Sequence, residues 1–216
     1  MQITEIVGFV TGALCVWLAV RQNVWTFPIG MLNNVAFGIL FVKAGLYAGA
    51  GLQAVYLLLG ALGCYWWLRG GTDRAHLSVH AVPRWGWLGI AVGTALSTLA
   101  LYAALTTWTD STVPAADALT TSLSLAAQLM MGRKWLGSWA VWITVDALFV
   151  VLYVNQGLWL TAVLYAGFIP LCVRGVYEWR RDMATQRVES IAASSGAAPG
   201  DAGAATGAVA AKTVHP

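Results

Sequence analysis

A single acidic residue, Asp146, stands in the middle of a long apolar segment of this chain. The segment from Trp139 to Val154 reads WAVWITVDALFVVLYV and contains no other charged residue. An unpaired carboxylate at mid-membrane depth costs several kcal/mol, and such residues usually line a path, a pocket or a proton relay. Asn33 and Asn34 stand at the corresponding depth of an upstream apolar segment. We interpret these polar positions as parts of a route for a solute.

Aromatic and polar residues recur at helical spacing near these positions. Trp142 lies one turn before Asp146 on the same helical face, so its ring is the preferred platform for stacking a flat or cationic group. Gln53 and Tyr56 are three residues apart and share a face of their own helix. That face either lines the path or joins helices through hydrogen bonds. Asp146 has the same structural alternative, in which the carboxylate is tied to neighbouring helices.

A polar stripe also follows a later apolar segment. Thr121, Ser124 and Gln128 are spaced by three and four residues, so they share one helical face. Small hydroxyl residues also let helices pack closely, and both interpretations stay open for this stripe. Asn33 and Asn34 point about 100° apart on a helix. We therefore expect one of them to line the path and the other to bond across helices.

The composition is that of an integral membrane protein. Hydrophobic residues make up 59% of the 216 residues and charged residues only 10%, where soluble domains carry roughly 25%. The mean hydropathy is +0.69. The basic residues are dispersed over connecting segments, which excludes a nucleic-acid-binding surface. We expect most tryptophans, including Trp85, Trp87, Trp108 and Trp179, to anchor the chain at the membrane interfaces.

Seven apolar segments are long enough to be membrane-spanning helices, each needing about 20 residues. The predicted fold class is therefore an all-α integral membrane protein with seven transmembrane helices. The predicted spans are Ile3–Val20, Val24–Val42, Leu46–Leu68, Trp85–Thr106, Ala115–Gly132, Gly137–Val154 and Leu158–Tyr177. Most connections are very short, so neighbouring helices must run antiparallel and side by side.

The chain contains an internal repeat, in which the stretch 37–69 aligns without a gap with the stretch 149–181. Thirteen positions of this alignment hold identical residues. In the same register Asn34 corresponds to Asp146, and Gln53 corresponds to Tyr165. We predict a first repeat at 1–69, a linker helix at 85–106 and a second repeat at 113–181. Because one helix links them, the two repeats are parallel, and proteins built in this way bind solutes between the repeats near the midplane.

The distribution of basic residues predicts the orientation. Seven spans place eleven of the twelve Lys and Arg residues on one side, and only Lys43 on the other. The excess of positive charge on cytoplasmic loops then predicts an external N-terminus and a cytoplasmic C-terminus. The transmembrane domain is expected to cover 1–182. After Arg187 the chain becomes rich in Ala, Gly and Ser, and we expect a disordered cytoplasmic tail over residues 183–216.

Two stretches resemble the PnuC family of bacterial vitamin transporters. They begin VWTFPIGMLNNVAFGILF at Val24 and DALTTSLSLAAQLMMGRKW at Asp117, and together they cover most of 23–67 and 117–165. The resemblance implies a 3+1+3 helical fold like that of the SWEET sugar transporters, often trimeric, in the bacterial inner membrane. It implies uptake of nicotinamide riboside, an NAD precursor, by facilitated diffusion, with a cytoplasmic kinase trapping the solute. Relatives within the family carry riboflavin or thiamine.

Other classes of protein are less consistent with this sequence. There is no GxxxxGK[ST] loop for ATP. His76 and His80 are four residues apart but have no third ligand nearby, so we expect no metal and no cofactor. A membrane-embedded enzyme would need a cluster of acids, histidines or a Ser/His pair at one depth, and a sensor would need a soluble signalling domain. The expected binding site is Asn33, Asn34, Gln53, Tyr56, Thr121, Ser124, Gln128, Trp142, Asp146 and Tyr165.

Overall fold

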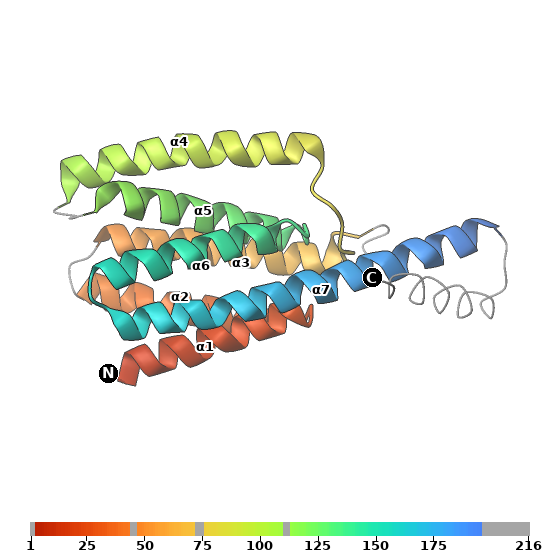
Figure 1. Cartoon of the computed structure of the whole chain (residues 1–216), viewed down its shortest axis with the longest axis horizontal. Helices are drawn as coiled ribbons and strands as arrows, with labels where there is room; N and C mark the ends of the chain where they lie inside the picture. Colours follow the sequence, from red (N-terminus) through yellow and green to blue (C-terminus); the bar gives the residue numbers. More distant parts are fainter. Residues whose placement is uncertain (1–2, 44–46, 72–75, 110–112, 196–216) are drawn as a thin grey trace, which may run out of the picture.

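The chain forms a bundle of helices in a computed structural model (Figure 1). The structure describes residues 3–43, 47–71, 76–109 and 113–195. Seven helices account for most of these residues. They are α1 (Ile3–Val20), α2 (Thr26–Lys43), α3 (Tyr47–Arg69), α4 (Arg84–Trp108), α5 (Pro114–Gly132), α6 (Ser138–Asn155) and α7 (Trp159–Ser195).

The outer surface of the bundle is apolar. Five helices, namely α2, α3, α4, α6 and α7, are long and apolar enough to cross a membrane. On α4 the side chains of Leu96 and Leu99 are 63% and 66% exposed. Water would not tolerate so large a continuous apolar surface, whereas lipid covers it at no cost. The chain is therefore a multi-pass membrane protein.

The predicted spans match the observed helices to within two residues, with one exception at the C-terminal end. Helix α7 continues to Ser195, so residues 183–195 are helical, where the sequence analysis expected a disordered tail. Met183, Ala184, Gln186 and Arg187 have high intrinsic helix propensity, which lets the helix extend past its apolar part. The remainder of the predicted tail, 196–216, lies outside the described residues.

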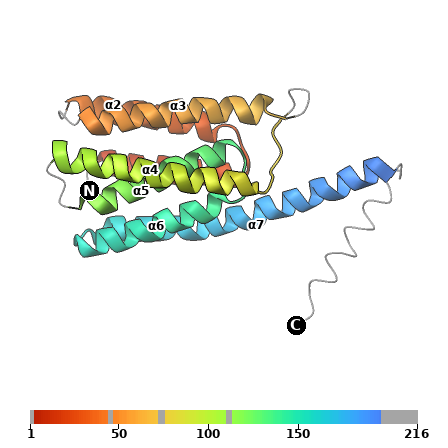
Figure 2. The ribbon, with the colours of Figure 1, turned by 90° about the horizontal axis from the view of Figure 1, so that it is seen from above.

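Six helices pack in a closed ring in the order α1, α2, α3, α5, α6 and α7, and α4 lies outside this ring against α5. Helices α2 and α3 form one antiparallel pair, and α6 and α7 form another, and Figure 2 separates these pairs clearly. Helix α1 packs against α2 and α7, while α5 packs against α3 and α6. The main contacts of α4 are with α5. The pairs α1–α7 and α3–α5 therefore join the first three helices to the last three.

Helices α1 and α5, which are counterparts in the internal repeat, end in the same way. Gln22 and Lys134 both adopt a left-handed backbone, each with φ of 50°. Their amides donate to the carbonyls of Ala19 and Met131, each at 3.0 Å. This hydrogen-bond pattern closes a helix most easily when the left-handed residue is glycine, as it is at Gly157. The two non-glycine residues therefore hold a strained backbone.

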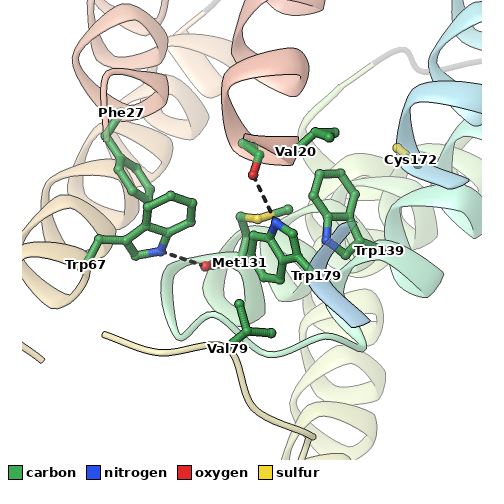
Figure 3. Packing of buried hydrophobic residues seen from close by; sticks show 9 residues of the cluster. Val20, Phe27, Trp67, Val79, Met131, Trp139, Cys172 and Trp179 are labelled. Carbon is green, nitrogen blue, oxygen red and sulfur yellow. Dashed lines mark hydrogen bonds between the residues drawn. The ribbon is translucent and has the colours of Figure 1, made fainter. Parts of the chain in front are cut away.

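An aromatic cluster fills the end of the bundle from which α7 projects, which we call the tail end (Figure 3). The rings of Phe27 and Trp67 meet edge to face at 5.0 Å, and those of Trp139 and Trp179 do so at 5.3 Å. These two pairs occupy corresponding positions of the two repeats. Trp67 and Trp179 also touch each other at 5.9 Å.

Trp179 therefore corrects one sequence-based expectation. Its side chain is fully buried, whereas those of Trp85 and Trp108 are more than 80% exposed, as interface anchors would be. Trp179 Nε1 donates to the carbonyl of Ala19 at 3.1 Å, and Trp67 Nε1 donates to the carbonyl of Met131 at 3.0 Å. Each tryptophan thus joins its own repeat to the other one, and this contact keeps Trp179 away from the interface.

The segment between α3 and α4 returns across the tail end. Val79 is buried in the aromatic cluster. His80 pairs through its backbone with the connection between α5 and α6, and its Nε2 accepts a hydrogen bond from Trp135 Nε1 at 3.1 Å. The other ring nitrogen of His80 lies 2.9 Å from the carbonyl of Ser78. Both ring nitrogens are thus engaged by the chain itself.

Candidate functional site

A cavity of about 670 Å³ lies inside the ring formed by six of the helices. Helices α1, α2, α3, α5, α6 and α7 contribute the lining residues that the structure describes, and α4 contributes none. Along α2 the lining extends from Thr26 to Phe41, and along α6 it extends from Trp139 to Tyr153. The cavity therefore spans most of the height of the bundle. Its size suits a small organic solute, since ligand cavities measure about 300–1,000 Å³.

Asp146 faces this cavity from the middle of α6. Its side chain is only 5% exposed. The thiol of Cys172 on α7 donates to Asp146 Oδ2 at 3.6 Å. The Tyr165 hydroxyl on α7 is close enough to Asp146 to interact with it electrostatically. The carboxylate has this weak thiol partner, and in the described part of the chain no Lys, Arg or His forms an ion pair with it.

Eight of the ten expected site residues line the cavity together. They are Asn33, Asn34, Gln53, Tyr56, Gln128, Trp142, Asp146 and Tyr165. Five different helices supply these side chains, so only the folded bundle brings them together. Trp142 lines the cavity one turn before Asp146, as its spacing predicted.

The two neighbouring asparagines differ from the expectation. Both Asn33 and Asn34 line the cavity, so the prediction that only one would do so is wrong. Helix α2 supplies eight lining residues, more than any other helix, because the cavity wraps around a wide face of it. Within the described residues, the amides of Asn33, Asn34, Gln53 and Gln128 make no side-chain hydrogen bond. These amides are free to bind a solute.

Thr121 and Ser124 do not line the cavity. Ser124 is buried, and its hydroxyl donates to the carbonyl of Thr120 one turn back at 2.8 Å. It also lies within hydrogen-bonding reach of the Tyr56 hydroxyl across α3 and α5. The packing alternative therefore describes Ser124, while the polar stripe reaches the cavity only at Gln128.

One wall of the cavity is aromatic. Tyr153 and Tyr165 stack with ring centroids 5.4 Å apart and planes inclined by 19°. Phe168, which also lines the cavity, meets Tyr165 edge to face at 5.9 Å, and Phe149, which is not a lining residue, packs against Tyr165 with the ring centroids 4.7 Å apart. The electron-rich faces of Tyr and Trp rings attract organic cations. The wall thus complements the carboxylate of Asp146.

The sequence analysis missed several lining residues, including Tyr153, Phe168 and Cys172. The internal repeat contained the signal that finds them. Phe168 is the counterpart of Tyr56 and Cys172 is the counterpart of Gly60, and all four line the cavity. The pair Asn34 and Asp146 follows the same rule. Taking the counterpart of each expected site residue in the other repeat would have added Phe168 directly.

The groups that line the cavity are suited to binding a solute. No group of three or more His, Cys, Asp or Glu residues that could hold a metal ion occurs among the described residues. The cavity offers one carboxylate, several amides and aromatic faces, and its described lining includes no Lys, Arg or His. Such a surface suits a flat solute that has hydrogen-bonding groups and is either neutral or positively charged.

A multi-pass helical bundle around a cavity lined by apolar and aromatic side chains with several amides and one carboxylate is the architecture of a membrane solute transporter. A family model described as "Nicotinamide mononucleotide transporter" matches residues 2–181. The chain therefore belongs to this transporter family, to which the PnuC proteins are related by sequence and by fold, as the following matches show.

Curated relatives and a solved structure agree with this membership. The nicotinamide riboside transporter PnuC of Escherichia coli strain K12 is 24% identical over 200 residues, covering 81% of this chain and 84% of the relative. The riboflavin/roseoflavin transporter RibM of Streptomyces davaonensis is 28% identical over 191 residues, covering 83% and 87%. The crystal structure of the vitamin B3 transporter PnuC superposes with a TM-score of 0.61 at 24% identity, covering 81% of this chain and 79% of that one.

Proposed function

We propose that this protein carries nicotinamide riboside across the membrane by facilitated diffusion, through alternating access to the central cavity. The proposal is supported chiefly by Asp146, a buried carboxylate that faces the cavity. The described lining of the cavity contains no Lys, Arg or His to balance its negative charge. Nicotinamide riboside has a fixed positive pyridinium ring, a carboxamide and a ribose. Trp142 and Tyr165 offer ring faces to the cation, and Asn33, Asn34 and Gln53 offer amides to the carboxamide and hydroxyls.

The charge of the cavity also separates the riboside from the mononucleotide. A phosphate group needs Lys, Arg or a helix N-terminus aimed at it. The described lining contains none of the basic residues and contains one acid. The riboside, without the phosphate, fits this cavity better than the mononucleotide for which the family is described.

Riboflavin is the second candidate solute. RibM, a riboflavin/roseoflavin transporter, is 28% identical to this chain. Riboflavin is neutral and has a large flat ring, for which the stacked wall of Tyr153 and Tyr165 is also suitable. For riboflavin Asp146 would act only as a hydrogen-bond acceptor. Thiamine, a cation, would use Asp146 as nicotinamide riboside does.

We further propose seven membrane spans in a 3+1+3 arrangement, with α4 as the linker. Contacts at corresponding positions of the two repeats support it, because Trp67 and Trp179 make equivalent hydrogen bonds to opposite repeats. The N-terminus would lie outside and the C-terminus in the cytoplasm of a bacterial inner membrane, as the distribution of basic residues favours. A homotrimeric assembly and a cytoplasmic kinase that traps the solute complete the proposal. In this scheme the chain is a carrier and not an enzyme.

Calorimetric titration of the purified protein tests the substrate. We expect nicotinamide riboside to bind at least tenfold more tightly than nicotinamide mononucleotide, with riboflavin and thiamine as the remaining comparisons. Asp146→Asn should weaken binding of a cation more than tenfold and binding of riboflavin only slightly. Glu189→Gln is the matched control, because Glu189 is exposed on α7 and is not among the residues that line the cavity. Equal binding of nicotinamide riboside by Asp146→Asn and the parent removes the counter-ion role.

A further inference from the structure

The two strained helix ends meet at the tail end of the bundle. Gln22 and Lys134 are counterparts in the two repeats, and each holds a left-handed backbone that glycine would adopt without cost. Lys134 Nζ donates to Gln22 Oε1 at 3.1 Å. Backbone strain of this kind persists where the surroundings impose it, and it is concentrated at switch regions. Here the contact between the two side chains joins the two repeats.

A third helix extends this polar contact. Gln22 Nε2 donates to Asp182 Oδ2 on α7. Lys134 Nζ also lies 4.6 Å from the centre of the Trp67 ring on α3. The side chain of Lys134 is only 7% exposed, so its ammonium group has little water around it. Gln22, Lys134 and Asp182 form what we call the polar latch.

The polar latch lies next to the tail-end lining of the cavity. Ala19 and Met131 line the cavity, and their carbonyls accept the hydrogen bonds of Trp179 and Trp67. The polar latch adjoins these two hydrogen-bonded tryptophans. Gln22 and Lys134 follow Ala19 and Met131, respectively, by three residues, and Lys134 lies over the ring of Trp67. The tryptophan hydrogen bonds and the polar latch together join both repeats at this end. Any opening of the cavity toward the tail end has to break these contacts.

We propose that the polar latch is the tail-end gate of the transport path. The hydrogen bonds of Gln22 stabilise the closed gate, and the cost of burying the charge of Lys134 destabilises it. The proposal rests on the proposed transport function and adds the control of access to it. Removing Gln22 deprives a buried cation of its hydrogen bond, which favours the open gate, where water surrounds Lys134. Replacing Lys134 with an apolar residue of similar length removes the cost of burying the charge, which favours the closed gate.

The surroundings of Lys134 explain why its burial destabilises the closed gate. Asp182 is the acidic group that faces it, and His80 of the segment before α4 contacts it through its backbone. The neighbouring arginines, Arg21 and Arg133, lie instead over the rings of Trp17 and Trp66. Burial lowers the pKa of Lys134 to about 8, although Asp182 opposes this shift. The electrostatic attraction of Asp182 therefore offsets only part of the cost of desolvating Lys134.

Labelling of a cavity thiol tests the gate without any solute. Cys15 lines the cavity, so a chain with Cys64→Ser and Cys172→Ser keeps one reporter thiol. A charged, membrane-impermeant thiosulfonate is applied to vesicles from the side that carries the C-terminus, identified by protease access to a C-terminal tag. Gln22→Gly should speed labelling at least fivefold, and Lys134→Met should slow it at least threefold.

Two controls separate gating from misfolding. Gln22→Gly suits the left-handed backbone, so relief of strain offsets part of the two lost hydrogen bonds, and thermal melting should show a single cooperative transition only a few degrees below that of the parent. Arg84→Gln, an exposed substitution at the same end, should label at the parent rate. Labelling of Gln22→Gly no faster than the parent, or of Lys134→Met no slower, overturns the latch. Because no solute is used, this failure would leave the binding results for nicotinamide riboside unaffected, and the converse also holds.

Discussion

Two glycines at equivalent positions of the repeats predict a matched pair of destabilised variants. A Cβ atom on Gly175 would lie 2.5 Å from Cε2 of Trp139, and one on Gly63 would lie 2.5 Å from Cε1 of Phe27. Ordinary contacts of this kind are 3.4–4 Å long, so each ring must move by about 1 Å. A Cβ on Gly89 of α4 would meet nothing within 4 Å, which makes Gly89→Ala the matched control.

The size of the effect follows from two opposing contributions. Overpacking a tight core costs about 1–3 kcal/mol, and replacing a helical glycine with alanine returns about 1 kcal/mol. Trp139 cannot move freely because it also packs against Trp179 at 5.3 Å, so the cost lies in the upper part of that range. We expect Gly175→Ala and Gly63→Ala each to lower stability by about 1–2 kcal/mol and Gly89→Ala to raise it by about 0.5–1 kcal/mol.

Thermal unfolding in detergent, followed by tryptophan fluorescence, measures these changes. About 1 kcal/mol corresponds to roughly 2–4 °C for a chain of this length, so Gly175→Ala should melt about 2–8 °C below the parent. Combining it with Trp139→Phe should give a smaller loss than the sum of the single losses, because the smaller ring makes room. If Gly175→Ala and Gly63→Ala both melt at or above the temperature of Gly89→Ala, the close packing at the tail end is refuted.

Three further predictions concern single side chains. Trp179→Phe should cost about 1–3 kcal/mol in thermal unfolding, because the Ala19 carbonyl loses one of its two donors and the smaller ring leaves unfilled space in the core, and Trp67→Phe should behave alike at Met131; a loss in only one of them would contradict the equivalence of the two repeats. The stability of the parent relative to Lys134→Met should rise between pH 8 and 10.5, measured as the difference in melting temperature. The sign follows because the folded pKa of Lys134, about 8, is below its ordinary value of 10.5, so the unfolded chain binds more protons in this interval. Tyr165→Phe keeps the ring stack but removes a hydroxyl, so calorimetry should show binding of nicotinamide riboside weakened about threefold or more with little change in melting temperature.

Most of the helical fold was predictable because lipid imposes simple rules on a chain. A span must be apolar for about 20 residues and must satisfy its own backbone hydrogen bonds, so the positions of α2, α3, α4 and α6 follow from composition alone. The end of α7 was less predictable. Beyond the apolar part, Met183 to Ser195 has no membrane to define it, and local helix propensity decided where the helix ends.

The candidate site was predictable at residues whose exposure to lipid would cost a large free energy. Asp146 had to face a cavity or a partner because a carboxylate facing lipid costs too much, and the structure places it against the cavity. Asn33 and Asn34 lacked such a constraint, since an amide is tolerated either in a path or between helices. Both asparagines line the cavity because it surrounds a wide face of α2, and helical spacing does not reveal that width.

The sequence by itself determined the membrane class, the helices, the internal repeat and the position of one buried acid. These follow from the cost of placing polar groups in lipid and from similarity between two halves of one chain. The tertiary structure alone decided which residues meet at the tail end. Trp179 is buried because α1 supplies a carbonyl for its indole, and Lys134 is buried because Gln22 of the other repeat accepts its hydrogen bond. Such contacts depend on the distance between segments far apart in the chain, which neither composition nor spacing encodes.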